Sequence, residues 1–389
     1  MKEKFLRELA DIQTGPFGSQ LHKEDYVADG TPIVTVEHLG NKMFSEQNLP
    51  RVSNTDKNRL KKYVLKQGDI VFSRVGSVDR CSYVDQKHDG WMFSGRCLRV
   101  RPTSEIDSEY LYYYFCLEET KQFVRNIAVG ATMPSINTKL LGEVVVTFPE
   151  LEQQKRISGI LSAIDSKIEV NQKINDNLEQ QAATYFQELF INNANSMWKI
   201  GTISDLGTVV GGSTPSKTKP EYYTDNGIAW ITPKDLSINK SKFISHGEND
   251  ITELGLMNSS ATVMPKGTVL FSSRAPIGYI AIASNEVTTN QGFKSVIPYL
   301  EIGTAFVYFF LKHSLPVIES AASGSTFKEI SGSAMKNIPA IIPDRSTLDQ
   351  FNSFCAPIFA QQKILEDQNH SIAPDISLGN RLSLSIASE

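Results

Sequence analysis

Gly130-Ala131-Thr132-Met133-Pro134-Ser135-Ile136 decides the fold, because its Gly, Thr and Ile recur at the same spacing in Gly324-Ser325-Thr326-Phe327-Lys328-Glu329-Ile330. Gly, Thr and Ile recur at a constant offset of 194 residues, and the same offset joins Pro149 to Pro343. Upstream, the stretch from Lys66 to Arg74 resembles the stretch from Lys266 to Arg274. A solenoid unit has about 20–50 residues, so a period near 200 indicates two duplicated domains.

The repeats, and the different residue pattern of the stretches that follow each of them, predict five segments. These are a first repeat domain (1–150), a central helical spacer (151–196), a second repeat domain (197–343), a distal helical spacer (344–373) and a divergent tail (374–389). Short β-like runs in each repeat alternate with Gly-, Ser- and Asn-rich turns, and the aromatic stretches 110–124 and 304–320 indicate helices. Each repeat is therefore expected to be a compact α+β domain.

The central spacer has the periodicity of a coiled coil. Apolar residues alternate at spacings of three and four from Ile157 to Leu189, and Asn171 and Asn175 complete the seam. Residues 151–192 contain no proline, which predicts one helix of about 40 residues and about 60 Å. A helix that packs only on its own domain is the less favoured alternative, because this length exceeds the width of such a domain.

The distal spacer has a second seam, which makes it the expected partner. Its positions are Leu348, Phe351, Cys355, Ile358, Gln362, Leu365, Asn369 and Ile372. Pro357 is expected to kink this helix and Pro374 to end it. Each helix leaves an equivalent point of its repeat, so antiparallel pairing predicts a pseudo-twofold relation between the halves.

Composition excludes several classes. The chain has 40% hydrophobic and 21% charged residues, lacks the apolar stretch of a signal peptide near Met1, and contains no run of about 20 apolar residues, so we expect a cytoplasmic protein. The four cysteines form no CxxC pair, and the histidines have no metal-ligand spacing, so no metal is expected. The net charge of −4 comes from the spacers and tail, and nearly neutral repeats are compatible with DNA binding.

Motifs of DNA-modifying chemistry are absent from the sequence. There is no Asn/Asp-Pro-Pro-aromatic loop for a flipped adenine and no GxxxxGK phosphate loop. We therefore expect a binding protein with no catalytic residues and no cofactor of its own.

The quoted residues resemble the specificity subunits of type I restriction-modification systems. The resemblance is carried by the stretch from Leu9 to Tyr26, by Gly68-Asp69-Ile70, and above all by Pro149 and the helix from Leu151 to Gln181. It covers nearly the whole chain. It implies two target-recognition domains, each reading one half of a bipartite DNA site, and two long antiparallel coiled-coil helices that space them.

The resemblance also implies partners. The helices would dock two modification subunits, which carry S-adenosylmethionine and methylate adenine, and restriction subunits, which use ATP and Mg²⁺, would complete the complex. The seam positions expected to bind partners are Ile157, Leu161, Ile164, Ile168, Asn171, Asn175, Leu178, Phe351, Ile358 and Leu365. The segment after His370 departs from the family, whose distal helix usually continues into a Leu-rich end.

Candidate DNA contacts are polar and basic residues in turns near the repeated motifs, because Arg and Lys neutralise phosphates and can contact guanine edges. They are Ser19, His22, Lys23, Arg74, Arg80 and Lys139 in the first repeat, and Lys217, Lys219, Lys234, Arg274 and Lys328 in the second. Arg74 and Arg274 are favoured because each follows a repeated Gly…Phe-Ser strand. Two alternatives remain: a diverged catalytic methyltransferase or nuclease, and a protein adaptor without a DNA ligand. The loops 36–62 and 232–264 differ most between the repeats, so two different half-sites are expected.

Overall fold

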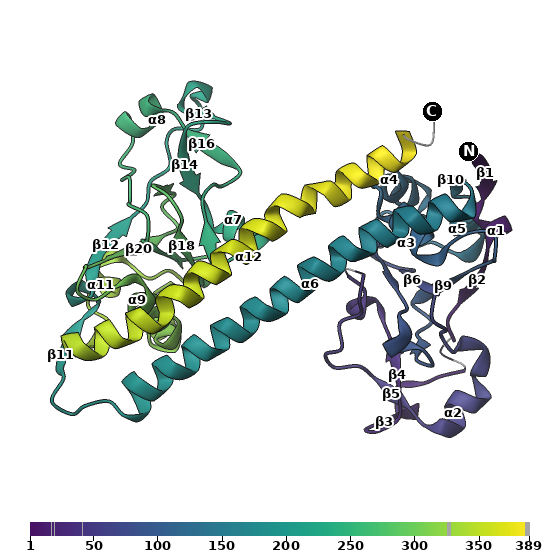
Figure 1. The fold of residues 1–389 in the computed structure, drawn as a ribbon, viewed down its shortest axis with the longest axis horizontal. Coiled ribbons are helices and arrows are strands. Elements are labelled where there is room, and N and C mark those ends of the chain that lie inside the picture. The colour runs from purple at the N-terminus through teal and green to yellow at the C-terminus, as the bar shows by residue number, and fades with distance from the viewer. Residues whose placement is uncertain (17, 19, 41, 325–327, 386–389) are drawn as a thin grey trace. The chain divides into compact units, whose positions relative to one another are not determined.

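The computed structural model describes residues 1–385 except 17, 19, 41 and 325–327, and it describes only the backbone of Lys23 and of residues 373–385. The chain forms two compact units, Met1–Ile168 with Ser371–Glu389 (unit 1) and Glu169–His370 (unit 2). Each unit contains both helices and sheets (Figure 1). The predicted α+β class is therefore confirmed.

Unit 1 contains a two-stranded ribbon and two four-stranded sheets. The ribbon pairs β1 (Lys2–Phe5) with β10 (Val145–Phe148). The larger sheet has the order β2-β9-β6-β7: Ala10–Thr14, Cys97–Pro102, Ile70–Ser73 and Cys81–Tyr83. The smaller sheet has the order β3-β5-β4-β8: Tyr26–Val27, Arg51–Val52, Thr31–Val34 and Met92–Phe93. The helices are α1 (Leu6–Leu9), α2 (Asn54–Arg59), α3 (Ser108–Cys116), α4 (Glu118–Ile127), α5 (Thr138–Gly142) and the first part of α6 (Leu151–Gln187).

Unit 2 is built from corresponding elements. Its ribbon pairs β11 (Lys199–Thr202) with β21 (Pro339–Ile342). The larger sheet has the order β12-β20-β17-β18-β15: Gly207–Gly211, Lys294–Pro298, Val269–Ser273, Ile277–Ala283 and Phe243–Ile244. The smaller sheet has the order β13-β16-β14-β19: Tyr223–Thr224, Asn249–Ile251, Ile228–Ile231 and Thr288–Thr289. The helices are the second part of α6, α7 (Pro233–Ile238), α8 (Glu253–Met257), α9 (Thr304–His313), α10 (Leu315–Ser320), α11 (Gly332–Lys336) and the first part of α12 (Arg345–Ser385).

The two units share one topology. The strand orders match position for position, apart from the added edge strand β15 in unit 2. Each smaller sheet contains one parallel pair, β4 with β8 and β14 with β19. Strand order depends on pairing between distant residues, so this agreement shows that the duplication seen in the sequence extends to the whole fold of each unit.

The aromatic stretches are helical, but each contains a break. Leu117 has extended backbone angles and separates α3 from α4. Ser314 separates α9 from α10, where Pro316 occupies the first turn, a position that tolerates proline because its missing N–H has no helical partner there. The short β-like runs predicted in each repeat are strands, and their ends lie within two residues of the expected positions.

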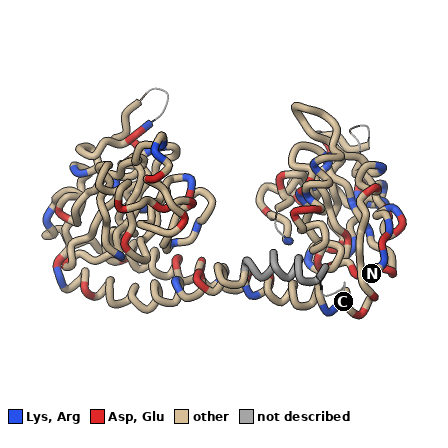
Figure 2. The backbone as a smooth tube through the Cα atoms, turned by 90° about the horizontal axis from the view of Figure 1, so that it is seen from above, with Lys and Arg blue, Asp and Glu red and all other residues tan. Residues whose placement is uncertain are grey.

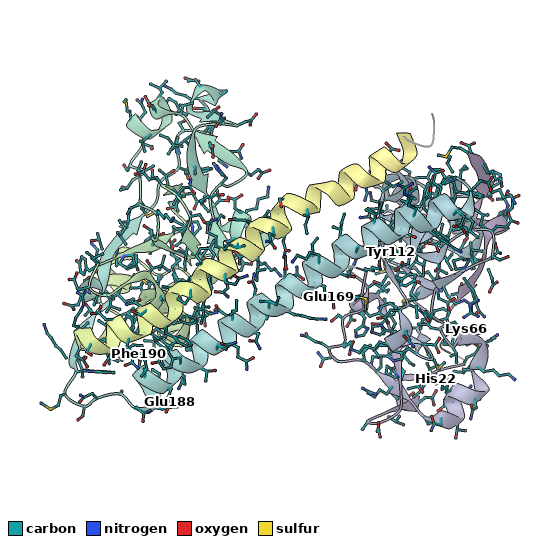
Figure 3. All side chains as sticks on the ribbon, viewed as in Figure 1. His22, Lys66, Tyr112, Glu169, Glu188 and Phe190 are labelled. Carbon is teal, nitrogen blue, oxygen red and sulfur yellow. The ribbon has the colours of Figure 1, made fainter. Side chains whose placement is uncertain are left out.

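The long central helix is confirmed. α6 covers Leu151–Gln187, and a π-helical turn (Glu188–Asn192) continues it to the predicted end. At 1.5 Å per residue α6 is about 55 Å long. Phe190, labelled in Figure 3, lies on the π-helical turn and is fully buried.

Within unit 2, α6 and α12 pack antiparallel. The Gln350 side-chain amide donates to the Tyr185 hydroxyl (2.6 Å), the Gln362 amide donates to the carbonyl of Asn175 (3.1 Å), and the Asn171 amide donates to Asn369 Oδ1 (2.8 Å). The residue numbers fall along α6 as they rise along α12. The predicted antiparallel pair and the distal seam are therefore confirmed, with every residue of that seam from Leu348 to Leu365 buried.

The first turns of α6 have a different partner from the one we expected. Leu161 is buried in the core of unit 1, and Ile157 packs against the same core. The Ser158 hydroxyl donates to Asp107 (2.8 Å), and the Asp107 N–H donates to the Gln154 side chain (2.8 Å). This part of α6 therefore covers its own domain, which the apolar seam alone did not predict.

The predicted end of the distal helix is wrong. α12 passes through Pro357 and Pro374 and ends at Ser385. A proline inside a helix removes one backbone hydrogen bond and crowds the preceding turn, which can bend a helix without ending it. The segment 374–385 therefore belongs to α12.

Candidate nucleic-acid interface

Three loops of unit 1 meet where β2 ends. The N–H of Gly15 donates to the carbonyl of Cys97 (3.2 Å), and the N–H of Ser94, which follows β8, donates to the carbonyl of Val34 at the end of β4 (2.8 Å). A Cβ atom at Gly15 would lie 2.1 Å from the carbonyl oxygen of Ser94. Only glycine allows this approach of two backbones. We call the resulting surface the first corner: Pro16, Gly18, Leu21, Tyr26, Thr35, Val36, Glu37, Ser94, Gly95 and Arg96.

Unit 2 builds the same corner from equivalent residues. The N–H of Ser213, after β12, donates to the carbonyl of Thr289 (2.9 Å), and the N–H of Asn290 donates to the carbonyl of Ile231 (3.0 Å). A Cβ atom at Gly212 would lie 2.0 Å from the carbonyl oxygen of Asn290. The glycine therefore has the same role in both units, and we call this surface the second corner: residues 212–217, 232–234 and 290–292.

The first corner encloses a pocket of about 370 Å³. Arg96 is exposed on its rim, and Glu37 supplies a carboxylate there. Tyr26 also lines the pocket, where burial, assisted by the charge of Asp25, raises the pKa of its hydroxyl. A neutral phenol both donates and accepts hydrogen bonds. The pocket thus combines a cationic donor, an acidic acceptor and a neutral hydroxyl, the groups that recognise base edges.

Arg74 supports this pocket from the side. Its guanidinium donates to the carbonyl of Gly95 (3.0 Å), and Gly95 belongs to the pocket lining. The side chain is partly buried, so its position differs from that of an exposed turn residue. Arg96, which the sequence reasoning missed, is the arginine that lines the first corner.

Arg74 and Arg274 are not equivalent, which corrects the alignment behind their selection. Ser73 pairs with Cys97, and Ser272 pairs with Phe293 in the same register. Arg74 therefore corresponds to Ser273, whereas Arg274 corresponds to Val75. Both arginines lie just after their strands, at neighbouring rather than equivalent positions of the duplicated fold.

Arg274 has an acidic partner. Its guanidinium lies 3.5 Å from the Glu329 carboxylate, and the ammonium of Lys294 lies 3.6 Å from the same side chain. Only 15% of the Lys294 side chain is exposed. Two cations around one carboxylate leave a net positive site beside the second corner. Lys294 lies in β20, outside the turns searched in the sequence, and for that reason it was missed.

The two repeated motifs of the sequence are neighbours in the fold. The N–H of Ile136 donates to the carbonyl of Arg74 (3.0 Å), and that of Ile330 donates to the carbonyl of Ser273 (3.1 Å). Gly130 and Gly324 have φ of 108° and 120°, a region that glycine enters without strain. In each unit the Gly…Ile motif therefore packs on the end of the strand that carries the Gly…Phe-Ser motif, and this contact explains why the two motifs recur together.

The remaining predicted residues lie at several places. His22, labelled in Figure 3, is exposed after the first corner, and its N–H donates to Asp25 (2.7 Å). Arg80 and Lys139 are exposed, the latter on α5. Ser19 lies outside the described residues, and Lys23 begins a short 3₁₀ turn without a described side chain.

In unit 2, the basic residues predicted on loops are exposed. Lys217 and Lys234 belong to the second corner, and Lys219 lies over the ring of Tyr222. Glu248 lies 2.6 Å from the Lys234 ammonium, and this hydrogen bond raises the lysine pKa. Lys328 is exposed beside residues that are not described. Figure 2 shows Lys and Arg interspersed with Asp and Glu over each unit, so local clusters rather than the net charge provide positive sites.

Half of the seam positions predicted to bind partner chains are buried by the chain itself. Leu161, Asn171, Phe351, Ile358 and Leu365 are buried. Those that are partly exposed are Ile157, Ile164, Ile168, Asn175 and Leu178. On the neighbouring faces, the large apolar side chains of α6 and α12 that are described and exposed are Ile160, Val170, Ile174, Phe354 and Ile364. These exposed side chains offer a surface that the buried seam cannot offer.

Other kinds of site were sought in the part of the chain that the structure describes. There, no three His, Cys, Asp or Glu side chains gather so that they could hold a metal ion. None of the helices described combines the length and the apolar character that a membrane crossing requires.

Comparison with known protein families matches both units. The model of a family described as type I restriction modification DNA specificity domain matches residues 1–180 and again residues 195–373. Each match contains one set of sheets, one corner and part of one long helix. The duplication is therefore a duplication of this family's domain.

Individual proteins resemble the chain over different lengths. The type I restriction enzyme MjaIX specificity subunit of Methanocaldococcus jannaschii is 43% identical over 162 residues, which cover 41% of this chain and 37% of that protein. The HindI specificity subunit of Haemophilus influenzae is 23% identical over 377 residues, 77% of this chain and 82% of that protein. A crystal structure of a type I restriction-modification system S subunit from M. genitalium aligns with a TM-score of 0.64 at 16% identity, covering 98% of this chain and 95% of that one. This likeness shows a common fold.

Proposed function

Since both halves match the specificity-domain family, this chain belongs to it, and we propose that the chain selects the DNA sequence at which a type I restriction-modification complex acts. The observation that carries the proposal is the corner that the structure contains twice, with one equivalent backbone hydrogen bond (Ser94 to Val34, Asn290 to Ile231) and the same sterically required glycine. Two copies of one binding surface fit a DNA target made of two half-sites.

Each corner would contact one half-site. Arg96 at the first corner and Lys217 and Lys234 at the second can contact phosphates or guanine edges, whereas Glu37 can accept a hydrogen bond from cytosine. The residues around the two corners differ, so the half-sites would differ and the target would be asymmetric. The helices α6 and α12 would act as the spacer, which implies a non-specific gap of several base pairs between the half-sites.

Catalysis would reside on other chains. Two modification subunits carrying S-adenosylmethionine would methylate adenine, and restriction subunits using ATP and Mg²⁺ would cleave DNA. This chain would supply specificity without a cofactor of its own. The comparisons favour this interpretation over a diverged methyltransferase or nuclease and over an adaptor without a DNA ligand.

The first test is a map of adenine methylation in the host with and without the gene. We expect a gapped, asymmetric motif that disappears on deletion and returns on complementation. The purified chain alone should bind DNA with an affinity that falls steeply with salt and should transfer no methyl group. An unchanged methylation map, or methyl transfer by the isolated chain, contradicts the proposal.

The second test assigns each corner to a half-site with matched glycine variants. Gly15→Ala places Cβ 2.1 Å from a backbone oxygen, whereas the control Gly159→Ala lies on α6, outside the first corner, and meets nothing within 4 Å. In unit 2, Gly212→Ala and Gly211→Ala form the same pair, with 2.0 Å against open space. Each clashing variant should relax the bases read in one half-site only, and each control should leave the motif unchanged. Identical effects of Gly15→Ala and Gly212→Ala on both halves would refute the assignment.

A further inference from the structure

Each unit contains a largely buried lysine that joins a loop of the recognition domain to the long helices. In unit 1 the carbonyl of Lys42 accepts the N–H of Tyr83 (2.9 Å), and in unit 2 the carbonyl of Lys242 accepts that of Ile282 (2.7 Å). Tyr83 pairs with Ile70, and Ile282 pairs with Val269, the first residue of the equivalent strand. Lys42 and Lys242 therefore occupy the same position of the duplicated fold.

The ammonium of Lys42 has three acceptors around it. Glu109 Oε1 lies at 2.8 Å, the Tyr113 hydroxyl at 3.1 Å and the Ser162 hydroxyl at 2.9 Å. Glu109 and Tyr113 belong to α3, and Ser162 belongs to α6. A lysine ammonium has three protons, so this set can use them all. Tyr113 in turn donates to Asp165 on α6 (2.6 Å), which adds a second connection to the helix.

Lys242 is bound more tightly still. Its ammonium forms an ion pair with Glu179 on α6 and donates to the Gln362 side chain on α12 (2.6 Å), and the ring of Phe359 lies 4.0 Å away. The N–H groups of Lys242 and Phe243 donate to the Glu366 carboxylate on α12 (2.8 and 3.0 Å). One loop position is thus bonded to both helices of unit 2.

The charges in this cluster remain in a largely buried setting. Burial lowers the pKa of Lys242. Burial alone would raise the pKa of Glu179, but Lys242 and Lys312 outweigh it and hold that pKa below its ordinary value. The lowered pKa favours the neutral form of Lys242 but the charged form of Glu179. Lys242 is the more deeply buried, with 6% of its side chain exposed against 23% for Glu179. Glu179 also has a second cationic partner, Lys312, at 2.6 Å.

A buried ion pair is a poor way to gain stability, because an apolar side chain of similar volume often serves as well. Its hydrogen bonds have directions, whereas apolar contacts allow one surface to slide over another. Both halves place a lysine here although most of their other residues differ. We propose that Lys42 and Lys242 are positioning residues that fix each recognition domain on its helices, and through this set the gap between the half-sites.

The inference rests on the proposed function, and its test uses the complex reconstituted with the modification subunits. Duplexes carry both half-sites of the methylation motif, with gaps that differ by single base pairs. The test variant is Lys242→Met, and the control is Lys240→Met, which changes an exposed lysine two residues away. We expect Lys242→Met to reduce the preference for the best gap over its neighbours at least threefold, while single-base changes within each half-site keep their usual cost.

A second variant separates positioning from folding. The double variant Lys242→Met, Glu179→Gln removes both charges. The glutamine side chain introduced at position 179 keeps an acceptor for Lys312 and for the Tyr308 hydroxyl, which in the wild type both donate to Glu179 (2.6 and 3.2 Å). This variant should recover thermal stability and retain the relaxed gap preference. Gap selectivity that returns together with stability, or that Lys242→Met leaves at the wild-type level, overturns the inference.

Unit 1 provides an independent copy of the experiment. Lys42→Met should also broaden the gap preference, because its three hydrogen bonds hold the other recognition domain. A wild-type complex without any preference for a gapped motif refutes the proposed function itself, and with it this inference. A gapped preference that neither lysine variant alters refutes the inference alone.

Discussion

Phe351→Ala should destabilise unit 2 far more than the same change three residues along α12. Phe351 is fully buried, and its ring centroid lies 5.2 Å from that of Phe190, 5.8 Å from Phe186 and 6.0 Å from Phe309. Truncation of such a phenylalanine to alanine costs about 3–5 kcal/mol, because a cavity remains. For a unit of this size 1 kcal/mol corresponds to about 2–4 °C, so the midpoint should fall by roughly 6–20 °C.

The matched control is Phe354→Ala. Phe354 is 39% exposed and contacts Tyr185 at 4.5 Å between ring centroids. Its removal opens no enclosed cavity, and a loss of about 1 kcal/mol, or roughly 2–4 °C, is expected. The assay is thermal unfolding of the full chain by calorimetry, in which the two units can be followed in one scan. Equal falls for the two variants would show that α12 is not anchored by the Phe351 cluster.

Three further predictions concern the helices and the first corner. Glu179 has a lowered pKa in the folded chain, so its stabilising contribution is present above its unfolded pKa of about 4.3 and is lost as the pH falls through the lower folded value. Between pH 6 and pH 3, the thermal midpoint of Glu179→Gln should therefore fall less than that of the wild type. An equal fall contradicts this role. Replacing Asn171 and Asn369 together by leucine should raise the midpoint of thermal unfolding, whereas Asn171→Leu alone should raise it less. A double-mutant cycle should give a coupling free energy of about 0.5–3 kcal/mol. Additive effects would refute the pairing. Arg96→Ala should weaken binding by about 1–3 kcal/mol and relax the first half-site if Arg96 contacts a base edge, and binding measured against single-base variants separates this from a phosphate contact, which would weaken all sequences alike.

Features with a short sequence period were predictable. The seam of α12 repeats every three or four residues, and each predicted position from Leu348 to Leu365 is buried, because helical geometry alone brings such residues to one face. The duplication was visible for a similar reason: Gly130 and Gly324 occupy a backbone conformation that other residues avoid, and so the letter itself recurs.

Features that depend on pairing between distant segments were decided by the tertiary structure. The sequence aligned Arg74 with Arg274. Strand register instead makes Arg274 equivalent to Val75, because hydrogen bonds to neighbouring strands set the register. The seam at Ile157 and Leu161 had the pattern of a coiled coil, yet its partner is the domain that precedes it, since an apolar stripe does not specify what covers it.

The buried lysines show the same division. An alignment of Gly68 with Gly267 brings Lys42 within one residue of Lys242, so the sequence carried a trace of the pair. Nothing local separates a buried lysine from a solvated one, however, because its burial depends on Glu109 and Ser162 in one unit and on Glu179 and Gln362 in the other. By itself the sequence determined the duplicated domains, the long helices and the absence of recognisable catalytic motifs. Only the tertiary structure decided which side chains meet at the corners and on the helices, because those contacts join residues up to 198 positions apart.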